Sequence, residues 1–98
     1  MKIAIIGAGN LGKSIAKGLI TTNAITTLYL TRRHVDGMKE FEGYKNIFLT
    51  SDNTEAVKNS DILIFAVQPA HLEKILIHIK PLLHDNHVLI STITGFSI

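Results

Sequence analysis

A glycine-rich turn near the start of the chain has the residue spacing of a dinucleotide-binding motif. Its residues are Gly7-Ala8-Gly9-Asn10-Leu11-Gly12. The apolar run 3–6 before the turn is typical of a buried strand, and apolar residues recur at helical spacing after it. In that context Gly7 allows a tight turn, Gly9 lets the backbone approach a pyrophosphate, and Gly12 lets the helix pack against the strand. The first N–H groups of the helix would bind the pyrophosphate.

The residues after the second expected strand distinguish between the two nicotinamide cofactors. In NAD sites an Asp or Glu about 20 residues past the glycines binds the ribose 2′-hydroxyl. Here the sequence is Thr31-Arg32-Arg33, and the first acid after it is Asp36. The guanidinium of Arg32 can pair with a 2′-phosphate, to which Thr31 can donate a hydroxyl bond, whereas an acid would repel the phosphate. The sequence favours NADP over NAD; a solvated basic pair is the alternative.

Two more segments follow expected strands on the side where ligands of open α/β sheets bind. Ala66-Val67-Gln68-Pro69 ends the fourth expected strand, and we expect it to pack against the ribose and nicotinamide. Thr92 lies in the segment 91–95, which ends the last expected strand, and its hydroxyl is expected to face the nicotinamide or the substrate. The alternative for residues 66–69 is that they only end a strand.

Other chemistries find little support in the sequence. The chain has no cysteine, which excludes disulfides and thiol catalysis. His71 and His78 are two helical turns apart, and His84 and His87 flank a polar turn, so a surface role is favoured over metal binding. The carboxylates show no pairing typical of glycosidases or proteases. We expect no catalytic side chain and no metal in this chain.

Expected strands and helices alternate along the chain. Strands are predicted at 3–6, 26–31, 47–49, 62–67 and 87–92, helices at 11–20, 54–59 and 71–83, and a short or irregular helix at 34–44. This order is typical of an α/β fold in which successive strands are parallel. The predicted fold is a Rossmann-type, doubly wound, mostly parallel sheet with helices on both faces.

Composition sets further bounds. The chain has 98 residues, of which 46% are hydrophobic and 18% charged, with a formal net charge of +2. This size predicts a single domain at 1–98, and the small, scattered charge argues against a nucleic-acid surface. No apolar run approaches the roughly 20 residues of a membrane span. We expect a cytoplasmic protein with a small-molecule substrate and no nucleic-acid or membrane partner.

Four blocks of the sequence together resemble pyrroline-5-carboxylate reductases. They are residues 1–12, Ser51-Asp52-Asn53, Ala66-Val67-Gln68-Pro69 and 91–98, and their order and spacing agree over essentially the whole chain. The resemblance implies an enzyme that reduces 1-pyrroline-5-carboxylate to proline with hydride from NADPH. It also implies that Asn53 lies near the adenosine ribose and its phosphate, and that Ala66, Val67 and Pro69 line the cofactor.

The chain departs from that family in two places and in length. The family usually has Lys where Gln68 stands, and Ala-Ala-Gly where this chain has Ile93-Thr94-Gly95. Its members also carry a second, all-helical domain that forms a dimer and supplies much of the substrate pocket. By this resemblance, 1–98 is the NADP-binding domain without that second domain, inactive alone, of a protein that is a homo-oligomer at full length.

Two other functions remain open at the level of sequence. One is another NADP-linked reductase, either a deazaflavin-dependent NADP reductase or a hydroxyacid dehydrogenase. Asn10-Leu11-Gly12 and Arg32-Arg33 would suit the deazaflavin-dependent type almost as well. The other is a nucleotide-binding module without catalysis. The ending Gly95-Phe96-Ser97-Ile98 favours the proline-forming reductase.

Overall fold

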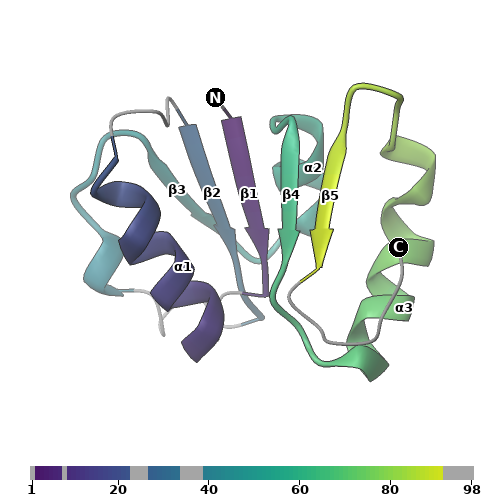
Figure 1. The fold of residues 1–98 in the computed structure, drawn as a ribbon, viewed down its shortest axis with the longest axis horizontal. Helices are drawn as coiled ribbons and strands as arrows, with labels where there is room; N and C mark the ends of the chain where they lie inside the picture. Colours follow the sequence, from purple (N-terminus) through teal and green to yellow (C-terminus); the bar gives the residue numbers. More distant parts are fainter. Residues whose placement is uncertain (1, 8, 23–26, 34–38, 92–98) are drawn as a thin grey trace.

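The structure is a computed structural model that describes residues 2–7, 9–22, 27–33 and 39–91. Its five strands are all parallel and form a sheet in the order β3-β2-β1-β4-β5 (Figure 1). The strands are β1 (Lys2–Ile6), β2 (Thr27–Thr31), β3 (Ile47–Thr50), β4 (Ile62–Phe65) and β5 (Val88–Ser91). The helices are α1 (Asn10–Ile20), α2 (Asn53–Lys58) and α3 (Pro69–Ile79), followed by the 3₁₀ turn η2 (Lys80–Leu82). The predicted Rossmann-type fold is confirmed.

Helices cover both faces of the sheet, and this explains the unbroken apolar run of β1. Successive side chains of a strand point to opposite faces. Ile3 and Ile5 pack in the core on the α1 side, while Ala4 and Ile6 pack with residues of α2 and α3 on the other side. All four are at most 3% exposed. A strand buried on both faces has no position for a polar residue, so it reads as continuously hydrophobic.

An ion-pair cluster joins α1 to the segment before β3. Glu40 contacts Lys13 at 2.9 Å and Lys17 at 3.2 Å, and the hydrogen bonds from these two ammonium groups, first that of Lys13, lower the pKa of Glu40. Lys13 and Lys17 are one helical turn apart, so one carboxylate reaches both. Glu40 belongs to a single 3₁₀ turn at residues 39–41, which is what the structure describes of the irregular helix predicted at 34–44; residues 34–38 lie outside the described part.

Apart from the irregular helix at 34–44, two predicted elements differ from the structure by two or more residues at an end, and the others agree within one residue over the described part of the chain. The predicted strand 62–67 ends at Phe65, because β1, its partner, turns away after Ile6 and leaves only a bond from the Ala66 N–H to the Ile6 carbonyl. The predicted helix 71–83 instead begins at Pro69, where a missing N–H costs nothing. It ends at Ile79, because Pro81 cannot continue the helical hydrogen bonds.

Among the described residues, helices cover the edge strand β5 on one face only. Leu89 packs against the core on the α3 side. Val88 and Ile90 point to the α1 side, in register with Ile62 and Ile64 of β4, and they are 52% and 44% exposed. α1 therefore shields β1 and β2 but does not extend over β5. None of the described helices is long and apolar enough to cross a membrane.

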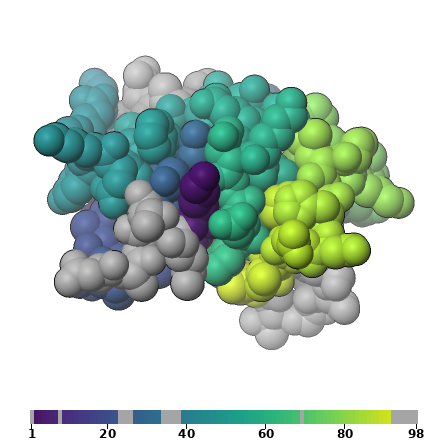
Figure 2. Space-filling model, turned by 90° about the horizontal axis from the view of Figure 1, so that it is seen from above, coloured from purple at the N-terminus to yellow at the C-terminus, as the bar shows by residue number. Residues whose placement is uncertain are grey.

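Two histidines form contacts near the end of the sheet at which the strands begin. This end of the sheet faces the viewer in Figure 2. The rings of His84 and His87 stack with centroids 3.7 Å apart, and the His84 N–H donates to Nδ1 of His87 at 3.1 Å. Nε2 of His87 therefore carries the proton, which it donates to the carbonyls of Ser60 at 3.0 Å and Val57 at 3.3 Å. These histidines join the loop before β5 to the end of α2. Among the described residues there is no group of three or more His, Cys, Asp or Glu that could hold a metal.

Candidate dinucleotide-binding site

A cavity of about 660 Å³ lies at the carboxyl ends of β1, β2 and β4. The chain runs from β1 outward to β3 on one side and places β4 and β5 on the other, so the strand order reverses between β1 and β4. Ligands of open α/β sheets bind at such a reversal, and the volume is that of a small-molecule site. The lining residues are Gly7, Gly9, Thr31, Arg32, Arg33, Ser51, Asn53, Ala66, Val67, Gln68, His71, Lys74 and Ile75.

The three glycines of the turn meet three different physical demands. Gly7 has φ +84°, and a Cβ there would lie 2.1 Å from Cγ1 of Val67. A Cβ on Gly12 would lie 3.0 Å from the Gly7 carbonyl oxygen, so a side chain there would push α1 away from β1. Gly9 has no atom within 4 Å of its Cβ position. The backbone at Gly9 thus borders open space in which an anion could approach it closely.

The start of α1 offers free backbone donors beside this space. The first helical hydrogen bond runs from the Lys13 N–H to the Gly9 carbonyl, so the amides of residues 10–12 have no intrahelical acceptor. No side chain in the described part of the chain caps this end, and the first turn holds no acidic residue. The positive end of the helix dipole and these amides favour a bound anion.

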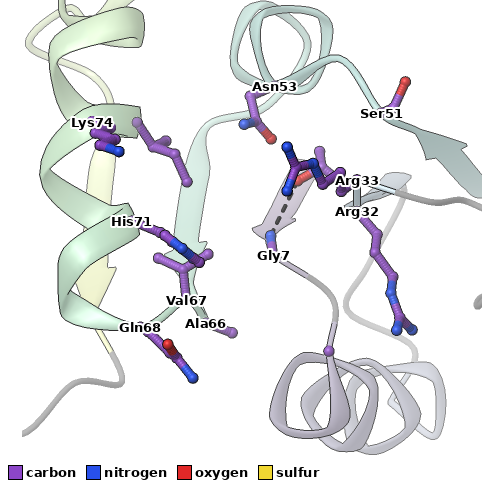
Figure 3. A pocket seen from close by; sticks show the side chains of 13 residues that line it. Gly7, Arg32, Arg33, Ser51, Asn53, Ala66, Val67, Gln68, His71 and Lys74 are labelled. Atoms are coloured by element: carbon purple, nitrogen blue, oxygen red, sulfur yellow. Dashed lines mark hydrogen bonds between the residues drawn. The ribbon is translucent and has the colours of Figure 1, made fainter.

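Thr31 has a task that the sequence did not predict. The Gly7 N–H donates to both the Oγ1 and the carbonyl oxygen of Thr31, each at 3.1 Å (Figure 3). The Thr31 side chain is 1% exposed. Its hydroxyl therefore holds the glycine turn after β1 against the end of β2.

Arg32 and Arg33 follow Thr31 directly and bring positive charge to the cavity. Their side chains diverge in Figure 3, so the two guanidinium groups lie apart from each other. Asn53 faces the same cavity from the first turn of α2. Asp52 caps that helix by accepting the Thr54 N–H at 2.9 Å, which fixes the position of Asn53.

The side of the cavity opposite Arg32 and Arg33 is formed by residues at the end of β4 and on α3. Val67 and Ile75 give it an apolar surface, and Gln68 stands just before α3 begins. His71 points from α3 toward the cavity (Figure 3). Such an apolar surface suits a flat base such as adenine.

Most of the predicted site residues meet here, but not all. The predicted residues that line the cavity are Gly7, Gly9, Thr31, Arg32, Arg33, Asn53, Ala66, Val67 and Gln68. Asn10, Leu11 and Gly12 form the first turn of α1 without lining the cavity, and Pro69 is the first residue of α3. Ala8 and Thr92 lie outside the described residues.

Sequence reasoning missed four lining residues: Ser51, His71, Lys74 and Ile75. His71 and Ile75 are four residues apart, so they share one face of α3. When the end of a strand lines a site, the helix that follows the strand can present one of its faces to the same site. The spacing of these two residues could have revealed that face.

Comparisons with known proteins agree with this geometry. A family described as "NADP oxidoreductase coenzyme F420-dependent" matches residues 2–95. The chain belongs to this family. The family description names NADP, the cofactor that Arg32 and Arg33 predict.

Two proteins of similar sequence are named as reductases of one kind. Pyrroline-5-carboxylate reductase 2 of Dictyostelium discoideum is 38% identical over 98 residues, which cover 98% of this chain and 33% of that protein. Pyrroline-5-carboxylate reductase of Arabidopsis thaliana is 36% identical over 106 residues, which cover 99% of this chain and 36% of that protein. The chain thus spans about a third of the length of these relatives. The predicted resemblance is confirmed.

Solved structures give the same result. A pyrroline-5-carboxylate reductase from Coxiella burnetii superposes with a TM-score of 0.82 at 27% identity, covering 92% of this chain and 34% of that one. The Plasmodium falciparum pyrroline carboxylate reductase, solved with NADP bound, has a TM-score of 0.74 at 27% identity and covers 93% of this chain and 32% of that one.

Proposed function

We propose that this chain is the NADP-binding domain of a pyrroline-5-carboxylate reductase. The observation that carries the proposal is the composition of one cavity: a glycine turn and a helix start for a pyrophosphate, and two arginines where an NAD site would have an acid. The names of the relatives reported above supply the substrate, pyrroline-5-carboxylate, and the resemblance seen in the sequence implies that the product is proline.

The residues present fit such a cofactor. The open space at Gly9 and the uncapped start of α1 would hold the pyrophosphate. Arg32, Arg33 and Asn53 would hold the adenosine ribose and its 2′-phosphate, while Ala66 and Val67 would pack against the cofactor. When bound, NADPH supplies the hydride that reduces the carbon–nitrogen double bond of the substrate.

We assign substrate binding and proton supply to groups outside residues 1–98. We propose an all-helical second domain that forms a homodimer and supplies most of the substrate pocket, with the proton for the ring nitrogen coming from that domain or from water. Gln68 lines the cavity just before α3 begins, and the resemblance to pyrroline-5-carboxylate reductases implies that a lysine is usual at this position. We propose a cytoplasmic location, with no nucleic-acid or membrane partner.

Titration with the two nicotinamide cofactors tests the NADP assignment. We expect Arg32→Ala with Arg33→Ala to weaken NADPH binding about 10- to 100-fold, because two charge-assisted contacts are lost, and to change NADH binding less than about twofold. Fluorescence of the bound nicotinamide measures both constants. Lys45→Ala with Lys58→Ala removes the same charge outside the cavity and serves as the matched control. Tighter binding of NADH than of NADPH by the wild-type chain would overturn the assignment.

A chimera tests the substrate. Residues 1–98 are joined to the part of the Dictyostelium discoideum relative that follows its matching region. We expect this protein to oxidise NADPH in the presence of 1-pyrroline-5-carboxylate, and the Arg32→Ala and Arg33→Ala version to do so only at much higher NADPH concentration. A folded chimera that binds NADPH but reduces a different imine or ketone would contradict the assigned substrate; one that reduces nothing would favour a non-catalytic module.

A further inference from the structure

Lys74 faces the same cavity as the two arginines but comes from the opposite side. It belongs to α3, together with the neighbouring lining residues His71 and Ile75. Figure 3 shows α3 on one side of the cavity and Arg32 and Arg33, beyond the end of β2, on the other. Cationic side chains thus approach one space from two separate elements.

The ammonium group of Lys74 meets no opposing charge in this space. No Asp or Glu is among the described residues that line the cavity. The ion pairs described in the structure join Lys13 and Lys17 to Glu40 and do not involve Lys74. Glu73 is adjacent in sequence, but successive residues of a helix point in different directions, and Glu73 does not line the cavity. Lys74 is therefore available to an anionic ligand.

The apolar lining residues show where such an anion would lie. Val67, just after β4, and Ile75, next to Lys74 on α3, give this side of the cavity a hydrophobic surface. Adenine packed on this surface would place its ribose between α3 and the arginines. A phosphate on that ribose would then lie within reach of a long, flexible lysine side chain.

We propose that Lys74 is a specificity-determining residue for the 2′-phosphate of the nucleotide, acting from α3 opposite Arg32 and Arg33. This inference rests on the proposed function of the cavity as an NADP site. A 2′-phosphate carries a charge of about −1.5 to −2 near neutral pH, whereas the 2′-hydroxyl of an unphosphorylated ribose carries none. Lys74 therefore distinguishes the two ligands by charge.

Two nucleotides without nicotinamide isolate this contribution. Adenosine 2′,5′-bisphosphate and adenosine 5′-monophosphate share the base, the ribose and the 5′-phosphate, and only the first has a 2′-phosphate. We expect Lys74→Ala to weaken the bisphosphate about fivefold at an ionic strength of about 0.05 M, less at about 0.5 M because salt screens exposed charges, and to weaken the monophosphate less than about twofold. Calorimetric titration measures all these constants.

Two further variants control for charge and for the helix. Lys74→Arg keeps the positive charge, so we expect it to keep at least half of the wild-type affinity for the bisphosphate. Lys58→Ala removes an exposed lysine from α2 that does not line the cavity, and we expect it to change neither ligand. Circular dichroism of each variant checks that α3 remains folded.

The outcomes separate this inference from the function on which it rests. Selective weakening of the bisphosphate in Lys74→Ala, with Lys58→Ala unchanged, supports the role of Lys74. A wild-type chain that prefers the bisphosphate, with Lys74→Ala unchanged or weakening both nucleotides equally, overturns the role of Lys74 alone. A wild-type chain that binds neither nucleotide overturns the NADP site and the role of Lys74 together.

Discussion

Gly7 shows at the scale of one residue how the backbone shapes this site. Two constraints exclude a side chain there: the φ of +84°, and Cγ1 of Val67, which lies where a Cβ would be placed. Gly43 has a similar φ of +92° but no atom within 4 Å of its Cβ position. A side chain at Gly43 would therefore meet only an unfavourable backbone conformation, whereas one at Gly7 would also overlap with Val67.

We expect Gly7→Ala to destabilise the protein more than Gly43→Ala. Gly43→Ala should lower the free energy of unfolding by about 1–2 kcal/mol, the cost of a left-handed conformation for a residue with a Cβ. Gly7→Ala should lower it by about 3–5 kcal/mol, because overlap with Cγ1 of Val67 adds a packing cost. Urea unfolding followed by circular dichroism measures both. Equal losses in the two variants would show that the overlap relaxes freely.

The sequence could predict the roles of residues that depend on the local course of the backbone. The spacing of Gly7 and Gly12 indicated a tight turn and a close helix, and the structure has both. It could not predict the bond from Gly7 to the Thr31 hydroxyl or the place of Lys74 in the cavity. Those depend on how β2 and α3 are placed beside β1, and contacts between residues far apart in sequence leave no local pattern.

At the scale of the elements, α2 depends on its cap. Asp52 is exposed and accepts hydrogen bonds from the Thr54 hydroxyl and the Thr54 N–H, and these, in that order, lower the pKa of its carboxyl. A carboxyl whose pKa is lower in the folded state stabilises the fold above its unfolded pKa. That stabilisation is lost as the pH falls through the folded pKa.

We therefore expect an acid-dependent weakening of the protein that Asp52→Asn lacks. Asparagine also caps helices but does not titrate. Between about pH 5 and about pH 3, the urea midpoint should fall further in the wild type than in Asp52→Asn. Glu40 contributes the same way in both proteins, because the Lys13 and Lys17 hydrogen bonds lower its pKa as well. An identical pH dependence of the two proteins would show that the cap has no effect on acid stability.

Element boundaries were predicted least well, for a reason that β4 illustrates. The apolar run continues to Val67, yet the strand ends at Phe65. A strand lasts only as long as its neighbour, and β1 ends at Ile6 because Gly7 turns the chain. The order of strands and helices, by contrast, followed from hydrophobic periodicity alone, because each element buries at least one face.

At the scale of the whole molecule, burial is uneven across the sheet. Ile64 and Ile90 are register partners on neighbouring strands and point to the same face. Ile64 is 8% exposed and packs in the core with residues of β1 and β2, whereas Ile90 on the edge is 44% exposed. The α1 side of the sheet is therefore a core at one edge and a surface at the other.

We expect the same substitution to have different effects at these two positions. Ile64→Ala should lower the free energy of unfolding by about 2–4 kcal/mol, because it leaves a cavity among packed side chains. Ile90→Ala should lower it by less than about 1 kcal/mol. Chemical denaturation measures both, and circular dichroism checks that each variant folds. A loss at Ile90 as large as that at Ile64 would mean that the face of β5 is covered in solution.

The bond between Gly7 and Thr31 has a consequence for regioisomers of the ligand. It joins the glycine turn, where we propose that the pyrophosphate binds, to the strand end that carries Arg32, and so sets the separation of the two proposed anion sites before any nucleotide arrives. In a nucleotide the corresponding separation is fixed by covalent bonds of the ribose. A phosphate moved from the 2′ to the 3′ oxygen changes that separation, whereas the Gly7–Thr31 bond holds the separation in the protein constant. We therefore expect the cavity to discriminate between isomers of identical charge by length alone.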